Sequence, residues 1–378
     1  MIPSEKIEEL KSHVDDISNY DFFSGDASHF CINNKGVESK LMWGTFEENI
    51  PYVTVIIPTY KRKKLLFECI NSVLNQREFD DFEIIIMDND YETFGMESDV
   101  WKMISEINSE KIKYFQNSQS AEWREDQGVK VSRTPWFVFL HDDDLLHPDT
   151  LRILTKTVDD NPDIKWLSVD HGILSQDEVL KKQQLTNDYK KSANIYYYDP
   201  KYACYGYVPY WQGSIINREA YINVGGMLSK RMGCGDMLSV PLFARKYPLW
   251  VLDGVGPLYF YRLWEGQNST GGTYLWTKNY ISEYIFFEFL NKKYHLFHRI
   301  FDYREWKQIE QKIENCNKNL VFNTQIDVKD VVYYCKIRKC WLKDSLLSEM
   351  ILDFMWKYYN IVLKFRRISK KYYRVIAL

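Results

Sequence analysis

The sequence predicts the α/β fold class, with a doubly wound, mostly parallel sheet at its core. Two observations lead to this prediction. Short apolar runs rich in β-branched and aromatic residues alternate with longer segments whose apolar residues recur at helical spacing. Polar or acidic residues directly follow several of these runs, where each strand would end. With 45% hydrophobic residues in 378, the chain can bury a large sheet and still carry a helical appendage.

The alternation begins at residue 53. The expected strands are continuous apolar runs bounded by polar residues, at 53–57, 83–87, 111–115 and 136–140. The helices expected between them are 61–75, 100–107 and 121–131. A repeated strand-helix-strand order is that of a parallel sheet with crossover helices. A nucleotide is the usual ligand of such a sheet and binds beyond the carboxyl ends of its strands.

The second part of the pattern is less regular. The expected helices there are 149–159 and 236–245, and the expected strands are 164–169, 211–217, 249–252 and 258–261. The polar, tyrosine-rich segment 175–210 is expected to be an insertion that shapes a substrate site. We expect three regions, namely an N-terminal extension (1–50), a main domain (51–270) and a C-terminal helical region (271–378).

Bulk composition argues against several classes of protein. A formal net charge of −3 is unfavourable for a nucleic-acid partner. Seven cysteines without a CxxC pair indicate reduced thiols, and therefore a cytoplasmic protein, rather than a disulfide framework or a zinc site. The N-terminus is too charged for a signal peptide, and no apolar run of about 18 residues is present to span a bilayer. Any contact with a membrane is expected to be peripheral.

Three consecutive carboxylates, Asp142, Asp143 and Asp144, follow the apolar run 136–140. Adjacent aspartates raise one another's pKa values in a dry site, so the arrangement is costly unless a cation or hydrogen-bond donors compensate it. A divalent cation is the simplest compensation. The alternative is a solvated loop or a helix cap. The position beyond the end of a strand favours a ligand site.

The motifs on this sheet closely resemble the glycosyltransferase family 2 pattern of GT-A fold enzymes. The first strand and its turn read VTVIIPTYKR, the second strand ends in MDNDY, and the acidic triplet lies in LHDDDLLHPDTL. A later Gly235-Asp236 pair matches the Glu-Asp pair of the family. The resemblance covers roughly residues 52–269 and implies a GT-A fold with a nucleotide-binding half and an acceptor half. Asn89-Asp90 and Gly235 depart from the usual Asp-Gly and Glu.

The resemblance also implies which residues hold the nucleoside of the donor. The backbone of the Pro58-Thr59-Tyr60 turn and the carboxylate of Asp88 would hold the base and the ribose, with Asp88 accepting from a uracil N–H. A carboxylate at a strand end can fix such a donor edge while the turn backbone supplies further hydrogen bonds. UDP is therefore the favoured nucleotide.

The acidic triplet matches the DxD element of the family. Asp144 would be the direct metal ligand, Asp142 would contact the ribose or a metal-bound water, and Asp143 would lie beside the nucleotide. The ion, Mn²⁺ or Mg²⁺, would offset the charge that builds on the departing nucleoside diphosphate. His141 stands where many family members have another Asp, and it is either part of this site or only a strand-end residue.

Asp236 matches the general base of the inverting enzymes. A sugar hydroxyl attacks an anomeric carbon efficiently only if it loses its proton during the displacement. Because Gly235 replaces the usual Glu, Asp236 would act without a supporting carboxylate. The alternative role for Asp236 is a helix N-cap, and one carboxylate can serve in both ways.

Four further side chains are expected around the donor. Arg262, in the segment YR followed by QNS, resembles the late loop of the family and would present a fixed cation to the diphosphate. Arg124 would pair either with phosphate or with a neighbouring carboxylate. Trp211 and Trp264 would stack on sugar faces or, as the alternative, pack in the core.

The expected function is metal-dependent, inverting transfer of a sugar from a UDP-sugar to a hydroxyl of a growing glycan. The resemblance implies bacterial surface polysaccharide synthesis on a lipid-linked acceptor, such as a polyprenyl diphosphate, at the cytoplasmic face of the membrane. One alternative is a nucleotidyltransferase, although the glycine-rich basic loop that it needs after the first strand is missing. The other is a catalytically inactive nucleotide-sugar-binding or scaffold subunit. Gly235 and the altered MDND turn, which depart from the family's motifs, are compatible with this alternative.

The C-terminal region is expected to end in an amphipathic helix. Apolar residues from Leu347 to Tyr372 are spaced alternately four and three apart. Within 357–378, seven residues are basic and none is acidic. A basic helix with tyrosines suits the surface of an anionic membrane. The alternative is that the stripe packs on the main domain or on a second copy of the chain, which would give a homodimer.

Overall fold

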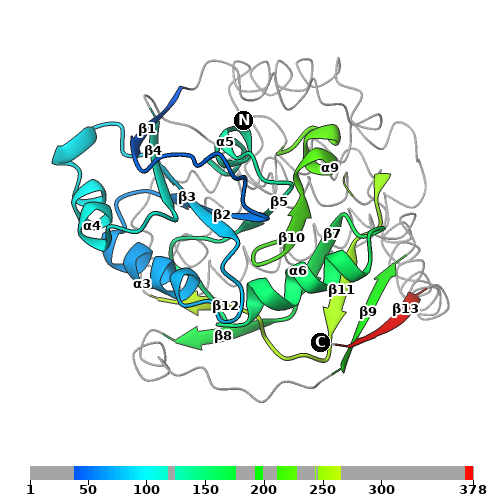
Figure 1. Cartoon of the computed structure of the whole chain (residues 1–378). Helices are drawn as coiled ribbons and strands as arrows, with labels where there is room; N and C mark the ends of the chain where they lie inside the picture. Colours follow the sequence, from blue (N-terminus) through cyan, green and yellow to red (C-terminus); the bar gives the residue numbers. More distant parts are fainter. Residues whose placement is uncertain are drawn as a thin grey trace, which may run out of the picture. The chain divides into compact units, whose positions relative to one another are not determined.

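A computed structural model of the chain describes residues 38–117, 124–175, 192–198, 211–227, 243, 246–264 and 371–377 (Figure 1). All of them belong to one of the two compact units into which the chain divides. This unit contains a ten-stranded sheet and a three-stranded sheet, together with helices, which confirms the predicted α/β class. The predicted helix 236–245 and region 271–370 lie outside the described residues, apart from Phe243.

The predicted parallel strands are present and adjacent. Four strands lie side by side and all run parallel, in the order β4 (Ile112–Asn117), β3 (Phe82–Asp88), β2 (Val53–Thr59) and β5 (Trp136–Phe139). Every residue of these four strands is buried, as expected for continuous apolar runs covered on both faces. β1 (Ser39–Trp43) pairs antiparallel with β4, so the sheet includes part of the predicted N-terminal extension.

Helices pack against both faces of these strands. The helices of the described unit are α3 (Lys63–Leu74), the short 3₁₀ helix η1 (Gly95–Glu97), α4 (Asp99–Ile107), α5 (Arg124–Val131), α6 (Thr150–Asp160) and α9 (Arg218–Asn223). On β2, Val55 and Ile57 belong to the core cluster shared with α3, α4 and α6, whereas Ile56 between them belongs to the cluster shared with α5 and α9. This alternation is the two-residue period of a strand. All of these helices are too short or too polar to cross a membrane.

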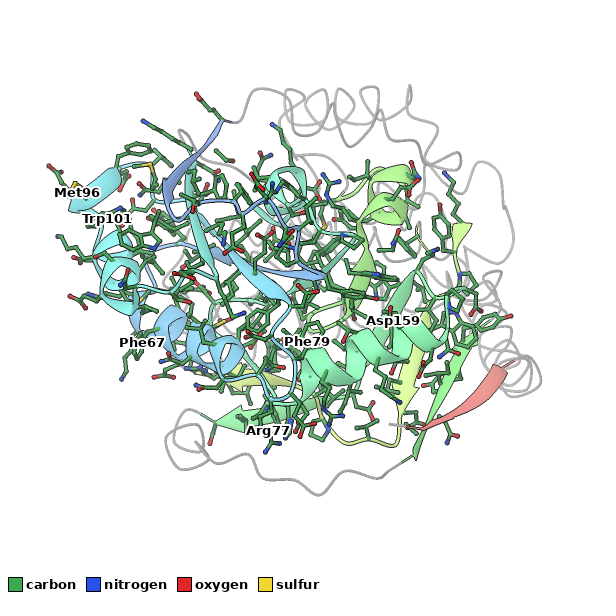
Figure 2. All side chains as sticks on the ribbon, viewed as in Figure 1. Phe67, Arg77, Phe79, Met96, Trp101 and Asp159 are labelled. Carbon is green, nitrogen blue, oxygen red and sulfur yellow. The ribbon has the colours of Figure 1, made fainter. Side chains whose placement is uncertain are left out.

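Two tryptophans join the edge strand to the helix layer. Trp101, labelled on α4 in Figure 2, donates its Nε1–H to the backbone oxygen of Met42 in β1 at 3.2 Å. The rings of Trp43 and Trp101 meet edge to face with their centroids 5.8 Å apart. β1 is therefore held by packing as well as by its ladder with β4.

The other half of the large sheet is mixed. β10 (Ile215–Asn217) runs antiparallel to both of its neighbours, β5 and β7 (Trp166–Val169). β11 (Trp250–Asp253) is parallel to β7, and β9 (Ser192–Tyr198) is antiparallel to β11. The predicted mostly parallel arrangement therefore holds for the half from β4 to β5, and it ends where β10 enters in the opposite direction.

The smaller, three-stranded sheet begins directly after the acidic triplet. β12 (Tyr259–Leu263) lies between β6 (Leu145–Leu146), with which it is antiparallel, and β8 (His171–Ser175), with which it is parallel. β6 begins directly after Asp144. The pairing of β6 with β12 therefore brings a distant strand beside the triplet.

The prediction that the C-terminal helical region continues to residue 378 is wrong for residues 371–377. These residues form β13 (Lys371–Ala377), which pairs antiparallel with β9 along seven residues and ends the large sheet (Figure 1). Aromatic and β-branched residues suit a strand, and β9 offers a free ladder edge to such a segment. Lys371 and Arg374 are therefore strand residues and not part of a basic helical flank.

The close packing of α5 on β2 yields a prediction about stability. A Cβ atom added at Gly128 in α5 would lie 2.3 Å from Cγ2 of the buried Ile56. Gly128→Ala should therefore lower the free energy of unfolding by about 1–3 kcal/mol, although alanine is the better helix former. Urea unfolding of the variant and of the parent chain measures the difference.

A double-mutant cycle supplies the control for this prediction. Ile56→Ala removes the methyl group that the new Cβ would meet, so the two substitutions together should cost less than the sum of their separate effects. Additive costs would show that the contact between Gly128 and Ile56 does not limit the packing.

Candidate active site

The polar residues at the carboxyl ends of β2 and β3 and those that follow β5 meet at one edge of the sheet. Thr59 pairs with Asp88 across β2 and β3, and the backbone N–H of Asn89 donates to the Thr59 oxygen at 3.1 Å. Oγ1 of Thr59 donates to Oδ2 of Asp142 at 2.7 Å. The structure therefore brings together residues that the sequence places at three separate strand ends.

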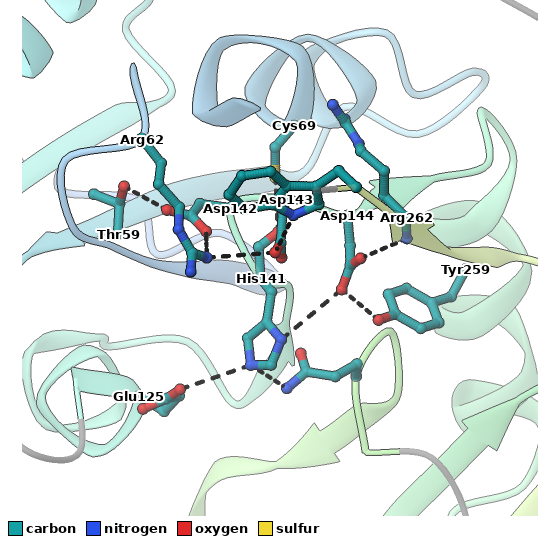
Figure 3. Close-up of polar contacts among 12 residues, drawn as sticks. Thr59, Arg62, Cys69, Glu125, His141, Asp142, Asp143, Asp144, Tyr259 and Arg262 are labelled. Atoms are coloured by element: carbon teal, nitrogen blue, oxygen red, sulfur yellow. Dashed lines mark hydrogen bonds and ion pairs between the residues drawn. The ribbon is translucent and has the colours of Figure 1, made fainter. Parts of the chain in front are cut away.

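Arg62 contacts the first two carboxylates of the triplet, both of which are buried (Figure 3). One guanidinium nitrogen donates to Oδ1 of Asp142 at 3.0 Å and to Oδ2 of Asp143 at 3.3 Å. Burial raises the pKa of Asp142, whereas the positive charge of Arg62 opposes this increase. The structure thus supplies some of the compensation that the sequence assigned to a divalent cation.

Trp264 lies beside the same carboxylates. Its Nε1–H donates to Oδ2 of Asp143 at 3.0 Å, and the Arg62 guanidinium lies over its ring at 5.4 Å from the centroid. Trp211 behaves differently, because it is buried and its ring packs on Phe139 with centroids 4.5 Å apart. The geometry therefore fits the core-packing alternative for Trp211 and places Trp264 at the acidic site.

Asp144 is fully buried and held by two donors from β12. The Tyr259 hydroxyl donates to Oδ2 at 2.5 Å, and the backbone N–H of Arg262 donates to Oδ1 at 2.9 Å (Figure 3). Burial raises the pKa of Asp144 to about 6, although these hydrogen bonds act in the opposite direction. Tyr259 was not predicted, because its partner lies 115 residues away in the chain.

The side chain of Arg262 is also fully buried. Its guanidinium donates to Oε2 of Glu68, on α3, at 2.5 Å. The charge that was predicted to face a diphosphate is therefore paired with a carboxylate in this structure. What the structure shows directly is that the backbone of Arg262 positions Asp144. Contact of Arg262 with phosphate stays a prediction.

His141, at the end of β5, joins the triplet to two further polar residues. Its Nδ1 lies 3.8 Å from Oδ2 of Asp144, and its Nε2 lies 2.7 Å from Nε2 of Gln212 and 3.9 Å from Oε1 of Glu125. Glu125 and Gln212 are both buried. Neither was predicted, although Gln212 directly follows the predicted Trp211.

Three side chains at this site could hold a metal ion. Ligand atoms of His141, Asp143 and Asp144 all lie within 4.8 Å of one another. This set includes the predicted ligand Asp144 but not Asp142, whose oxygens accept from Thr59 and Arg62. One imidazole nitrogen and carboxylate oxygens form a donor set that suits a divalent cation. The residues therefore fit the predicted ion.

Asp88 is fully buried at the end of β3. The Tyr114 hydroxyl donates to its Oδ2 at 2.7 Å, and the backbone N–H of Asp90 donates to its Oδ1 at 2.9 Å. Binding of a uracil N–H by Asp88 stays a prediction. In the neighbouring turn, Tyr60 is exposed.

Two predicted site residues lie outside the part of the chain that can be described. They are Asp236, with its neighbour Gly235, and the side chain of Arg124, whose backbone begins α5. Their predicted roles as general base and phosphate ligand remain predictions.

Residues 54–221 match the family model described as glycosyl transferase family 2. An uncharacterized glycosyltransferase of Haemophilus influenzae is 24% identical over 46% of this chain and 56% of its own length. The poly(ribitol-phosphate) β-N-acetylglucosaminyltransferase TarP of Staphylococcus aureus is 35% identical over 27% of this chain and 31% of its own. The GalNAc(5)-diNAcBac-PP-undecaprenol β-1,3-glucosyltransferase of Campylobacter jejuni is 31% identical over 28% and 34%. This chain thus spans about half, or less, of these relatives.

Two solved structures show a looser likeness. S. aureus TarS in complex with UDP has a TM-score of 0.48 at 12% identity, covering 75% of this chain and 77% of that one. The mannosyltransferase PcManGT from Pyrobaculum calidifontis, in complex with GDP-Man and Mn²⁺, has a TM-score of 0.46 at 12% identity, covering 95% and 97%.

The raised pKa of Asp144 predicts that cation binding depends on pH. A protonated carboxyl is a poor ligand, so affinity for Mn²⁺ should fall about tenfold for each pH unit below about 6. The stability of the ion-free protein changes with pH in the opposite direction. Because the pKa of Asp144 in the folded state lies above the ordinary 3.8, this group stabilises the folded state at low pH, and the stabilisation is lost as the pH rises through about 6.

Titration of the full chain with Mn²⁺, followed by electron paramagnetic resonance from about pH 5 to about pH 8, measures the effect. Asp144→Asn is the control and should remove most of the binding. Equal affinity of the parent chain at both ends of this range would contradict the prediction.

Proposed function

Since residues 54–221 match the family model described as glycosyl transferase family 2, we propose that the chain transfers a sugar from a UDP-sugar to a hydroxyl of a lipid-linked or growing glycan, in an inverting, metal-dependent reaction. The observation that carries the proposal is the buried triplet Asp142–Asp144 at the carboxyl edge of a parallel sheet, where such folds bind nucleotides. The name of the C. jejuni relative, which includes an undecaprenol-linked acceptor, supports the lipid-linked class of acceptor.

The ion site of the proposal uses carboxylates that the structure already holds in place. Asp144 would ligate Mn²⁺ or Mg²⁺, Asp143 would lie beside the nucleotide, and Asp142 would contact the ribose or a metal-bound water. The ion supplies positive charge that offsets the charge on a departing diphosphate. Thr59 and Arg62 orient Asp142, while Tyr259 orients Asp144. Because both carboxylates accept protein hydrogen bonds, little reorganisation is needed when a ligand arrives.

The remaining roles follow the sequence motifs. Asp88 and the Thr59 turn would bind the nucleoside, and the N–H of Arg262 would keep Asp144 in its place. Asp236 would accept the proton of the acceptor hydroxyl as that oxygen attacks the anomeric carbon. The electron pair of the breaking glycosidic bond would leave with the diphosphate oxygen.

The experiment that tests the proposal is a screen of nucleotide sugars with Mn²⁺ for release of the nucleoside diphosphate. UDP released from one UDP-sugar supports the proposal. Pyrophosphate formed from UTP and a sugar phosphate would indicate a nucleotidyltransferase instead. UDP-sugar binding, seen as a raised melting temperature, without turnover on any acceptor would indicate an inactive binding subunit.

The general base is tested by one substitution. Asp236→Asn should reduce turnover by about two to four orders of magnitude, because the amide cannot accept the acceptor's proton, while UDP and Mn²⁺ still bind. The turnover rate at saturating donor measures catalysis, and the rise in melting temperature with UDP and Mn²⁺ measures binding. Asp253→Asn, at the end of β11, is a matched control and should leave turnover unchanged. Unchanged turnover in the Asp236 variant would remove Asp236 as the base.

Membrane contact is part of the proposal because a lipid-linked acceptor must be reached at a membrane surface. The segment 357–370 still holds five basic residues and no acidic one after β13 is excluded. Basic segments bind anionic lipid surfaces through charge attraction. Unlike truncation after residue 356, charge reversal leaves β13 in place.

We therefore expect Lys364→Glu with Arg366→Glu and Arg367→Glu to weaken binding to anionic vesicles by at least tenfold, since each basic residue contributes about 1 kcal/mol. Sedimentation with phosphatidylglycerol vesicles measures it. A control with Lys102→Glu, Lys156→Glu and Lys246→Glu carries the same change of charge on other segments. Equal loss in both variants would mean that net charge, and not this segment, determines binding.

A further inference from the structure

Two buried acceptor atoms beside His141 are not used by the described residues. Gln212 is 4% exposed and Glu125 is 7% exposed, yet Oε1 of Gln212 and Oε2 of Glu125 accept no hydrogen bond from any described group. A buried acceptor without a donor costs about 1–3 kcal/mol. Both side chains face His141, with Nε2 of Gln212 at 2.7 Å and Oε1 of Glu125 at 3.9 Å from the imidazole Nε2. A proton on Nε2 of the imidazole would be a single donor, and Gln212 is the one of these two residues within hydrogen-bond distance of it.

The tautomer of His141 links these acceptors to the acidic triplet. Turning the Gln212 amide by half a rotation would place its oxygen next to Nε2 of His141. If Nε2 then carries the proton and donates it to that oxygen, Nδ1 is unprotonated and its lone pair can bind a metal ion. Nδ1 faces Asp144, at 3.8 Å from Oδ2 (Figure 3). The ligand atoms of His141, Asp143 and Asp144 all lie within 4.8 Å of one another.

From this geometry we infer that His141 is a metal ligand through Nδ1, together with Asp143 and Asp144, and that Glu125 and Gln212 position its ring. The inference rests on the proposed function, since it concerns the same ion site. Histidines that bind metals generally donate their other ring N–H to a carboxylate or carbonyl oxygen, which fixes the tautomer and makes the ligand more basic. Gln212, in the segment before β10, can supply such an oxygen when its amide is turned, and the Glu125 carboxylate of α5 lies 3.9 Å from the same ring nitrogen.

A nitrogen ligand determines which ions the site accepts. Mg²⁺ is a hard ion that prefers oxygen ligands and gives up its water reluctantly. Transition-metal ions accept imidazole more readily. The site should therefore favour Mn²⁺ over Mg²⁺ more strongly than an all-oxygen site would. His141→Asp converts it into such an all-oxygen site within the same fold.

The test uses the full chain with UDP and Mn²⁺ and detects the ligand directly. Pulsed electron paramagnetic resonance should show the ¹⁴N modulation of a directly bound imidazole in the parent chain. His141→Asp should lose this modulation while still binding Mn²⁺, and its preference for Mn²⁺ over Mg²⁺, measured by competition, should fall about tenfold or more. Glu125→Gln should weaken Mn²⁺ binding by about 10–100-fold, as expected when a carboxylate behind a metal-binding histidine is lost.

His171→Asn is the matched control, because His171 is exposed on β8. It should keep both the ¹⁴N modulation and the ion preference. Modulation that persists in His141→Asp, or that is missing in a parent chain that binds Mn²⁺, would overturn the inference and leave the glycosyltransferase proposal in place. A parent chain that binds no Mn²⁺ would overturn both the inference and the metal-dependent part of the proposed function.

Discussion

The burial of three adjacent carboxylates is the constraint on which the site depends. Ionised groups with little access to water are unstable unless hydrogen bonds and opposite charges compensate for the lost hydration. Here the compensation comes from separate parts of the chain: Thr59 and Arg62 at or just after the end of β2, and Tyr259, Trp264 and the backbone of Arg262 in or beside β12. The triplet therefore joins the large sheet to the small one, and the site exists only when both have formed.

The charges at the site do not cancel. Arg62 pairs with Asp142 and Asp143, while Arg262, whose side chain is buried, is paired with Glu68. Contacts to Asp144 are hydrogen bonds from neutral groups, apart from His141 at 3.8 Å. A carboxylate in this position keeps a raised pKa and gains more from a divalent ion than an exposed carboxylate would. The local electrostatics therefore favour Asp144 over Asp142 as a ligand for an ion.

The parts of this structure that sequence patterns could predict are those determined locally. β2, β3 and β5 are continuous apolar runs, so the positions of Thr59, Asp88 and the triplet at strand ends followed from them. The contacts of Tyr259, Glu125 and Gln212 could not be predicted in this way, because each depends on the pairing of segments far apart in the chain. β13 was missed for another reason: its first two residues lie at the end of a longer helical stripe that stops at Tyr372, whereas pairing with the edge of β9 selects the strand.

The register of β12 explains how a distant strand can position Asp144 so closely. Leu145 and Leu146 of β6 pair with Phe260 and Tyr259, and β6 follows Asp144 without an intervening residue. The ladder therefore fixes the Tyr259 hydroxyl and the Arg262 N–H relative to the Asp144 carboxylate. A slip of β12 by one residue would turn Tyr259 to the other face of the small sheet and leave Asp144 buried without that donor. The cost of such a buried carboxylate opposes the slip, so the polar site and the strand register stabilise each other.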